Sequence, residues 1–294
     1  MFGKARYAHI NKGLNRRFEE KKSLVAVHRG VWGGNIIENT VPSYVIAFEA
    51  GADIIECDVI SSTDGILYVF HDGTEWRLFH KPDNIKTMSS AEIDAISCRN
   101  SIGEESGVHV ERFETILQRF DNGELFNIDR AWDILPQLAT TLKRYPRSIE
   151  QAIIKTPVKP EHLRFFDTYP EKYMYMPIVY SMKEVEQVLS FREINLVGME
   201  LIAYSKEAEL FQDKNLGYIK EQGLFIWANT IKLGSKPSQV LFAGLDDDYA
   251  LLSSPDKAWG ELFRKGVDVL LTDWPMQLGC YRDRFYSLAF NNVK

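Results

Sequence analysis

The sequence predicts an α/β fold, a single-domain TIM-type (β/α)8 barrel, and three observations lead to that prediction. The chain has 294 residues, which suits one large domain, and barrels of this type commonly occupy about 250 residues. Short apolar runs alternate with longer segments of helical periodicity, which is typical of a parallel sheet covered by helices. Several runs, such as LVAV and VDVLL, are apolar on both faces, as strands covered on both sides are.

Nine apolar runs are candidate strands, whereas a closed barrel needs eight. One of the nine is therefore spurious or lies outside the barrel, and the sequence does not say which. The runs cover residues 24–28, 54–59, 66–71, 125–129, 152–155, 176–180, 197–201, 224–229 and 267–272.

Segments with helical periodicity lie between these runs. Thr40 is a suitable N-cap for the first of them, with Pro42 in its first turn and Gly51 at its end. The predicted helices cover residues 41–51, 89–97, 112–120, 131–145, 181–191, 205–213 and 258–266.

The barrel is predicted to span residues 24–280, between an N-terminal extension over 1–23 and a C-terminal tail over 281–294. The longest interval between candidate strands, residues 72–124, is predicted to be a long βα loop after the third strand. Such a loop would carry helices of its own and lie over the active-site end of the barrel.

Composition excludes several classes of protein. The formal net charge of −6 argues against a nucleic-acid binder, although a bound metal would still allow an anionic substrate. Three cysteines match neither a zinc site nor a disulfide framework. We find neither a secretory signal nor an apolar run of about 20 residues, so we expect a cytoplasmic protein without stable membrane insertion. The sequence does not specify an oligomeric state.

The first three candidate strands become strongly polar toward their C-terminal ends. Because active sites of (β/α)8 barrels lie at those ends, the polar groups should converge. They are His28 and Arg29 after the first run, Glu56 and Asp58 within the second, and His71 at the end of the third.

Glu56 and Asp58 are two residues apart, which places both carboxylates on the same face of a strand. Two carboxylates facing one barrel interior resist burial unless a cation compensates them. Oxygen ligands of this kind suit Mg²⁺ or Ca²⁺. The alternative is a carboxylate pair held by Arg29 or Lys155 without a metal.

His28 and His71 are candidates for a general acid and a general base, because imidazole titrates near neutral pH. A structural role is the alternative for each of them. The other histidines lie in polar or loop contexts and are predicted to be surface residues; they are His9, His80, His109 and His162.

Later strands add further candidates. Asp129 ends the fourth candidate strand and could be the third metal ligand. Lys155 could bind a phosphate oxygen or, equally, form an ion pair with a barrel carboxylate. Glu200 and Trp227 lie near strand ends, and both are predicted to contact substrate, Trp227 as a wall of the pocket. Asp273 is predicted to cap the turn after the last strand.

The motifs HRG, ENT, GADIIECDV, TDG and VFHD follow one another between residues 24 and 74. In this order and spacing they resemble the glycerophosphodiester phosphodiesterase family, which has a TIM-barrel fold. A weaker match, IWANT followed by GVDVLLTDWP, extends the resemblance to residue 275. The resemblance implies hydrolysis of phosphodiesters of glycerol and a small alcohol with a divalent metal.

The resemblance also implies roles for individual residues. His28 and His71 would be the acid/base pair, and Arg29 would contact the phosphate. Glu56 and Asp58 would be metal ligands. In the ENT motif, Glu38 would be a pocket residue near the metal and the glycerol part of the substrate.

The fourth strand departs from the family pattern, which usually has Glu-x-Lys there. The sequence reads NIDRAW, so Asp129 would replace the glutamate and Lys155 on the next strand would replace the lysine. This departure indicates a divergent branch, similar to the agrocinopine phosphodiesterases that open sugar phosphodiesters, and leaves the alcohol open.

Other functions remain as alternatives. A phospholipase D-like enzyme or a cyclic-product lyase on the same barrel would keep both histidines. A non-catalytic barrel that binds a phosphorylated metabolite would tolerate the changed fourth strand, but it has no need of an acid/base pair.

Overall fold

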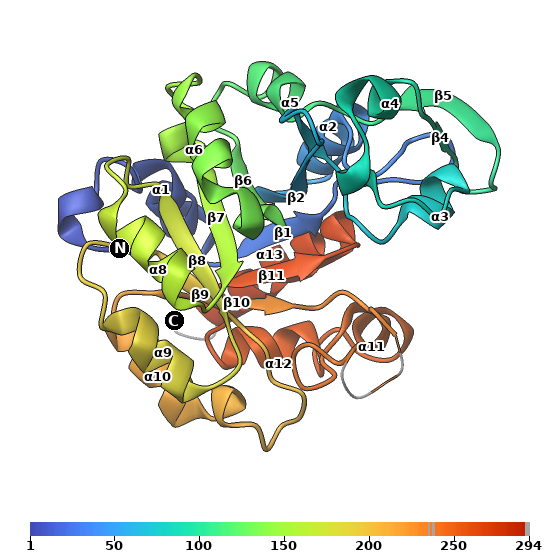
Figure 1. The fold of residues 1–294 in the computed structure, drawn as a ribbon. Coiled ribbons are helices and arrows are strands. Elements are labelled where there is room, and N and C mark those ends of the chain that lie inside the picture. Colours follow the sequence, from blue (N-terminus) through green and yellow to red (C-terminus); the bar gives the residue numbers. More distant parts are fainter. Residues whose placement is uncertain (235, 237–238, 292–294) are drawn as a thin grey trace.

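The computed structural model describes residues 1–234, 236 and 239–291. Eight of the described strands form a closed parallel barrel surrounded by helices (Figure 1). Strand β1 pairs in parallel with both β2 and β11, and this closes the ring. The predicted TIM barrel is confirmed. In order around the ring the strands are β1 (Leu24–His28), β2 (Ile54–Ser61), β6 (Leu125–Asp129), β7 (Ala152–Pro157), β8 (Met174–Val179), β9 (Gly198–Leu201), β10 (Phe225–Asn229) and β11 (Val269–Thr272).

One of the nine candidate strands, residues 66–71, lies outside the barrel. β3 (Leu67–Val69) runs antiparallel to β2, with Val59 opposite Val69 and Ser61 opposite Leu67. Only residues 62–66 connect the two strands, and a parallel neighbour would need a crossover of a dozen or more residues. The prediction that residues 66–71 form the third barrel strand is therefore wrong.

The long insertion consequently follows the second barrel strand, not the third. It projects from the barrel as a small subregion with its own apolar core, which includes Tyr68, Phe79 and Ile93 (Figure 1). Its elements after β3 are α3 (Glu75–Phe79), η2 (Ile85–Thr87), α4 (Ser90–Asp94), β4 (Ser97–Arg99) and β5 (Glu105–His109).

Helices cover the outside of the barrel. Helix α2 is the first of the helices predicted from the sequence. It has the predicted cap, since the Thr40 side chain accepts a hydrogen bond from the Ser43 backbone N–H. In the described part of the chain, none of the helices combines the length and the apolar character needed to cross a bilayer. The helices outside the insertion are η1 (Ala5–Tyr7), α1 (Lys12–Lys21), α2 (Val41–Glu49), α5 (Phe113–Arg119), η3 (Ala131–Ile134), α6 (Leu135–Lys143), α7 (Ser148–Gln151), α8 (Pro160–Thr168), α9 (Met182–Leu189), η4 (Glu209–Phe211), α10 (Asp213–Glu221), α11 (Asp247–Leu252), α12 (Trp259–Arg264) and α13 (Pro275–Asn291).

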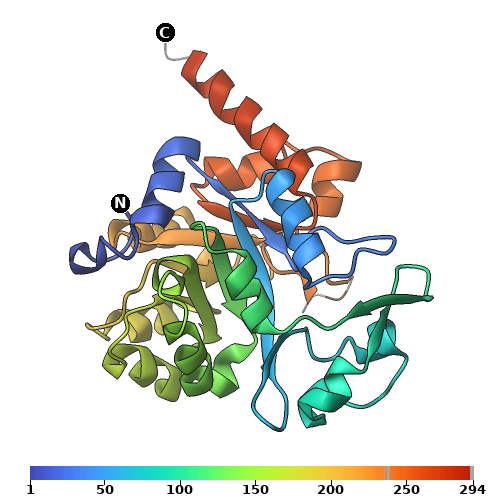
Figure 2. The same cartoon turned by 90° about the horizontal axis from the view of Figure 1, so that it is seen from above.

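The N-terminal segment is tied to the barrel, whereas the end of the C-terminal helix is not. Leu14 and Phe18 of α1 are buried in the same apolar cluster as the interior side chains Leu24 and Phe225, so α1 covers the N-terminal end of the strands. At the other end, α13 runs without a break through the predicted boundary at residue 280 and extends away from the body (Figure 2). The segment before residue 24 therefore shares the barrel core.

Replacing Leu14 by Ala should lower the free energy of unfolding by about 2–5 kcal/mol, because truncation leaves a cavity in a closed apolar layer. Glu19→Ala, on the exposed side of the same helix, should change it by less than about 0.5 kcal/mol. Urea unfolding of both variants measures the difference. Equal effects would contradict the role of α1 in the core.

Candidate active site

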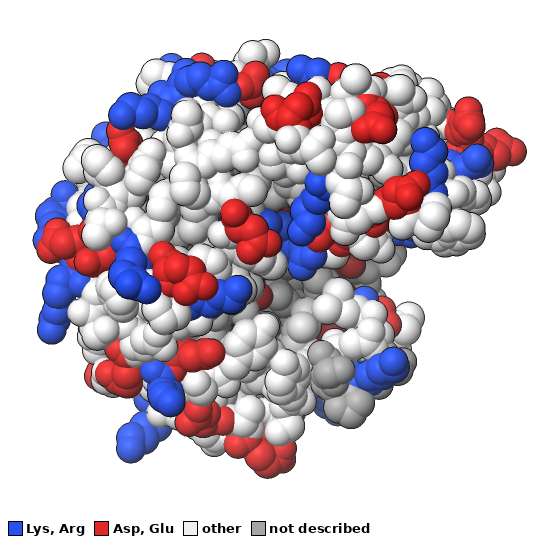
Figure 3. Space-filling model, in the orientation of Figure 1, with Lys and Arg blue, Asp and Glu red and all other residues white. Residues whose placement is uncertain are grey.

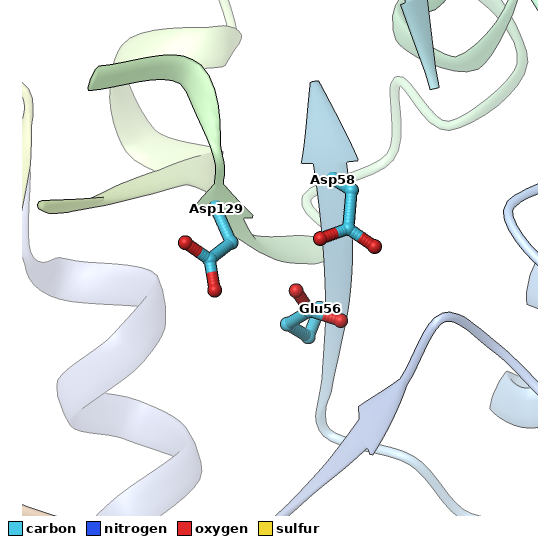
Figure 4. A group of neighbouring side chains, drawn as sticks. All are labelled: Glu56, Asp58 and Asp129. Atoms are coloured by element: carbon cyan, nitrogen blue, oxygen red, sulfur yellow. The ribbon is translucent and has the colours of Figure 1, made fainter. Parts of the chain in front are cut away.

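The C-terminal ends of the barrel strands open beside the insertion, where the molecular surface is hollowed (Figure 3). Glu56 and Asp58 lie on β2, and Asp129 ends the neighbouring β6, where it is in register with Asp58. One oxygen from each of the three carboxylates lies within 4.8 Å of the others (Figure 4). The structure thus brings together the three acids that the sequence predicted as metal ligands.

Basic side chains contact two of these acids. The Nε atom of Arg29 lies 3.2 Å from Asp58 Oδ2, and Lys155 Nζ lies 2.7 Å from Asp129 Oδ2. Glu56 Oε2 accepts only a 3.2 Å hydrogen bond from the backbone N–H of Arg29. Glu56 Oε1 and Asp58 Oδ1 have no hydrogen bond to another described residue, so each keeps free coordinating capacity.

The charge at the barrel mouth is not balanced by the protein. Burial raises the pKa of Glu56 well above its usual value, and the charge of Asp58 raises it further. Among the described residues, five linked or adjacent carboxyl groups face three basic side chains, so the acids exceed the bases by two in formal charge. The acids are Glu38, Glu56, Asp58, Asp129 and Glu200, and the basic residues are Arg29, Arg77 and Lys155.

A divalent cation fits this arrangement. Three converging carboxylates are the hard oxygen ligands that Mg²⁺ and Ca²⁺ prefer, and the excess charge matches a dication. The alternative from the sequence was that Arg29 or Lys155 holds the pair Glu56 and Asp58 without a metal. Arg29 contacts Asp58, but among the described residues no basic side chain forms an ion pair with Glu56.

Lys155 is buried and paired with two acids. Its ammonium group lies 2.9 Å from Glu200 Oε2 as well as 2.7 Å from Asp129. Burial lowers the pKa of Lys155, but the two carboxylates outweigh burial and the net effect is an increase. The structure therefore favours the ion-pair interpretation of Lys155 over contact with a phosphate.

Glu200 and Trp227 also differ from expectation. Glu200 is buried and bonded to Lys155 and, through its other oxygen, to Asn229 Nδ2 at 3.0 Å. Trp227 is fully buried in the barrel interior, where its Nε1 donates to Asn229 Oδ1 at 2.8 Å. Trp227 therefore does not line a pocket as predicted. Its bond to Asn229 holds the side chain that in turn binds Glu200.

His28 ends β1, where it is in register with Glu56 of β2. Its Nδ1 lies 3.0 Å from Asp273 Oδ1. From the sequence, Asp273 was predicted only to cap a turn. In the structure its carboxylate orients the His28 imidazole through Nδ1, so that Nε2 is not used in this contact. Of the four histidines predicted to lie on the surface, His162 is in fact buried and bonded to the backbone oxygen of Pro157.

His71 reaches the site from the end of β3, not from a barrel strand. Burial lowers the pKa of His71, with an opposing contribution from the charge of Asp58. The next residue, Asp72, is bound by Arg130 Nε at 2.9 Å and by Lys86 Nζ at 2.9 Å. These bonds anchor the segment, and Arg130 was not recognised from the sequence.

Arg29 lies in the tight turn after β1. Its φ is 56°, and Gly30 follows with a φ of 80°. A Cβ on Gly30 would lie 2.8 Å from a Ser43 backbone atom, so the close approach of α2 requires glycine there. The turn directs the Arg29 guanidinium to Glu38 Oε1 at 3.0 Å, and Arg77 binds the other oxygen of Glu38 at 2.6 Å.

Asn39, which follows Glu38 in the ENT motif, contacts the acidic cluster and was not singled out from the sequence. Its Nδ2 donates to Asp58 Oδ2 at 3.0 Å, and its Oδ1 accepts a hydrogen bond from the Tyr44 hydroxyl at 2.8 Å. Asn39 thereby fixes the orientation of one carboxylate of the cluster.

A family model described as the glycerophosphoryl diester phosphodiesterase family matches residues 28–203, and a model described as a domain of unknown function matches residues 175–281. A glycerophosphodiester phosphodiesterase of Caldanaerobacter subterraneus is 34% identical over 134 residues, which are 46% of this chain and 52% of the relative. Another from Bacillus altitudinis is 31% identical over 130 residues, 44% of this chain and 50% of the relative. The chain spans about half the length of these curated relatives.

Solved structures share the fold. A glycerophosphoryl diester phosphodiesterase from Parabacteroides distasonis superposes with a TM-score of 0.67 at 16% identity, covering 87% of this chain and 84% of the other. A phosphodiesterase from Oleispira antarctica, in complex with the product sn-glycerol-3-phosphate, superposes with a TM-score of 0.63 at 17% identity, covering 88% and 96%.

The acidic cluster should bind one Mg²⁺, Ca²⁺ or Mn²⁺ ion per chain. Glu56→Gln and Asp58→Asn should each weaken binding by at least about tenfold, because each removes a charged oxygen ligand. Glu111→Gln, a half-buried acid outside the cluster, should leave affinity unchanged. Isothermal titration calorimetry measures all four proteins, and wild-type affinity in both cluster variants would contradict the assignment.

Proposed function

Because the chain belongs to the glycerophosphoryl diester phosphodiesterase family, we propose that it is a metal-dependent phosphodiester hydrolase. Its substrates would be glycerophosphodiesters or a related small sugar or polyol phosphodiester. One observation carries the proposal: three carboxylates converge within 4.8 Å of one another, next to His28 at the end of the neighbouring strand β1. The product in the Oleispira antarctica neighbour, sn-glycerol-3-phosphate, belongs to the same chemical class as the product expected here.

Glu56, Asp58 and Asp129 would hold the metal ion. When bound, a divalent ion supplies Lewis-acid polarisation of a phosphate oxygen and offsets negative charge. Both excess negative charges at the barrel mouth would be compensated by one such ion.

The histidines would move the protons. One imidazole accepts a proton from the attacking water, or from a neighbouring substrate hydroxyl, as the new P–O bond forms. The other donates a proton to the alkoxide as the old P–O bond breaks. The bond from His28 Nδ1 to Asp273 fixes the tautomer that leaves Nε2 for this exchange.

Arg29 would contact the phosphate. Its guanidinium is largely buried and already bridges Asp58 and Glu38. Burial lowers the pKa of Arg29, but the two carboxylates outweigh burial, so the group stays positively charged. A fixed positive charge beside the cluster stabilises the negative charge that grows on the phosphoryl oxygens in the transition state. Lys155 would act indirectly, by holding Asp129.

Two clefts beside the site offer room for the alcohol groups. One of about 480 Å³ lies under the insertion and includes Glu38 and Arg77. The other, of about 460 Å³, lies at the start of α13 and includes Asp273 and Trp274. Trp32 lines both clefts. Their volumes are in the range of small-molecule sites, so we propose that the alcohols extend into these clefts.

His28→Asn and His71→Asn should each lower kcat by about 10² to 10⁴-fold, because each removes a proton-transfer group. His109→Asn, on the exposed hairpin of the insertion, should retain wild-type kcat. Steady-state kinetics with circular dichroism as a folding control measures these effects. Near-wild-type turnover in either site variant would refute the acid/base assignment.

Wild-type protein with Mg²⁺, Ca²⁺ or Mn²⁺ should release a phosphate monoester and an alcohol from glycerophosphocholine, glycerophosphoinositol or a sugar phosphodiester. Excess EDTA should stop the reaction, and added metal should restore it. Phosphorus NMR identifies the products. A cyclic phosphate as the final product would favour a lyase, and metal binding without turnover of any diester would favour a non-catalytic binding protein.

A further inference from the structure

Asp247, the first residue of α11, is a buried acid outside the cluster and the clefts. Its side chain accepts four hydrogen bonds, and among the described residues no basic side chain pairs with it. Burial raises the pKa of Asp247 to about 6 in spite of these donors. Burying a carboxylate without a counter-ion is costly, so its retention calls for an explanation beyond packing.

The two oxygens of Asp247 hold different parts of the molecule. Oδ1 accepts from the Thr230 hydroxyl at 2.7 Å and from Trp259 Nε1 at 3.0 Å. Oδ2 accepts from the Thr272 hydroxyl at 2.8 Å and from the backbone N–H of Asp273 at 3.1 Å. One carboxylate therefore ties the end of β10 and helix α12 to the turn that follows β11.

That turn carries the partner of His28. Thr272 ends β11, and its hydroxyl also accepts a 2.9 Å hydrogen bond from the backbone N–H of Trp274. Asp273, between them, places Oδ1 3.0 Å from His28 Nδ1. Because the backbone N–H of Asp273 is fixed by Asp247, the direction in which the Asp273 side chain leaves the turn is fixed as well.

We propose that Asp247 is a positioning residue, which holds the turn after β11 so that Asp273 orients the imidazole of His28. The positioning role of Asp247 rests on the proposed function only in those experiments that measure enzymatic activity. It assigns Asp247 no contact with the substrate or the metal.

An amide cannot replace this carboxylate. Each oxygen of Asp247 receives one hydrogen bond from a group that can only donate, the indole of Trp259 on one side and the Asp273 backbone on the other. An asparagine offers one acceptor oxygen, so its NH₂ group would face an N–H donor on the opposite side. Asp247→Asn should therefore disturb the groups that the carboxylate ties together, the turn included, although its shape is conserved.

Two threonines give a pair of variants on the two sides of the carboxylate. Thr272→Val removes a donor from Oδ2 and also the acceptor of the Trp274 backbone N–H, and Thr230→Val removes a donor from Oδ1 and also the bond to the Leu271 backbone oxygen. Both threonines are fully buried, so similar losses of thermal midpoint are expected. If Asp247 positions Asp273, Thr272→Val should lower kcat by about 10- to 100-fold with KM nearly unchanged, and Thr230→Val should keep kcat within about twofold.

A second measurement does not depend on activity. In nitrogen NMR of the wild-type protein, the His28 imidazole should show a protonated Nδ1 hydrogen-bonded to a carboxylate. Asp273→Asn should shift this signal, and Thr272→Val and Asp247→Asn should shift it in the same direction, whereas Thr230→Val should not. In the Asp273→Asn background, Asp247→Asn should cause no further loss of kcat.

The outcomes separate the two proposals. Equal kcat losses in both threonine variants, additive losses in the double variant, or an unmoved His28 signal in Thr272→Val and Asp247→Asn would overturn the positioning role. A wild-type protein that turns over no phosphodiester would overturn the proposed function, and the NMR comparison would still decide whether Asp247 positions Asp273.

Discussion

The arrangement of the barrel mouth depends on one constraint, the close approach of three carboxylates, two of them buried, on adjacent parallel strands. The pleat of β2 directs Glu56 and Asp58 to the interior, and the register with β6 adds Asp129 beside them. Like charges at this separation in a low-dielectric interior repel strongly. The fold partly compensates them with Arg29 and Lys155 and leaves a net negative charge that suits a divalent ion.

The two histidines expected to transfer protons lie next to loops that are held by residues with no expected role in the chemistry. Asp72, bonded to Arg130 and Lys86, anchors the start of the insertion next to His71. On the opposite side, Asp247 holds the turn that leads from β11 to α13. His28 thus contacts an acid in a loop, and His71 directly precedes another such acid. Hydrogen bonds hold both loops in place.

The sequence predicted the barrel and the acidic cluster because both follow from local patterns. Alternation along β2 is enough to pair Glu56 with Asp58, and strand ends converge in any closed parallel barrel. β3 was misassigned because an apolar run does not reveal its direction; the Thr-Asp-Gly turn before it was the available signal for a hairpin. The partners of Lys155 and the role of Asp273 depend on which side chains face each other across strands, which a single sequence does not specify.

The central claim is that Glu56, Asp58 and Asp129 share one metal ion. An anomalous difference map from crystals soaked in Mn²⁺ tests it most directly. The account predicts one strong peak within coordinating distance of all three carboxylates, with the Lys155 ion pairs still in place. A map with no peak there at saturating Mn²⁺, or with the metal bound to other side chains, would contradict it.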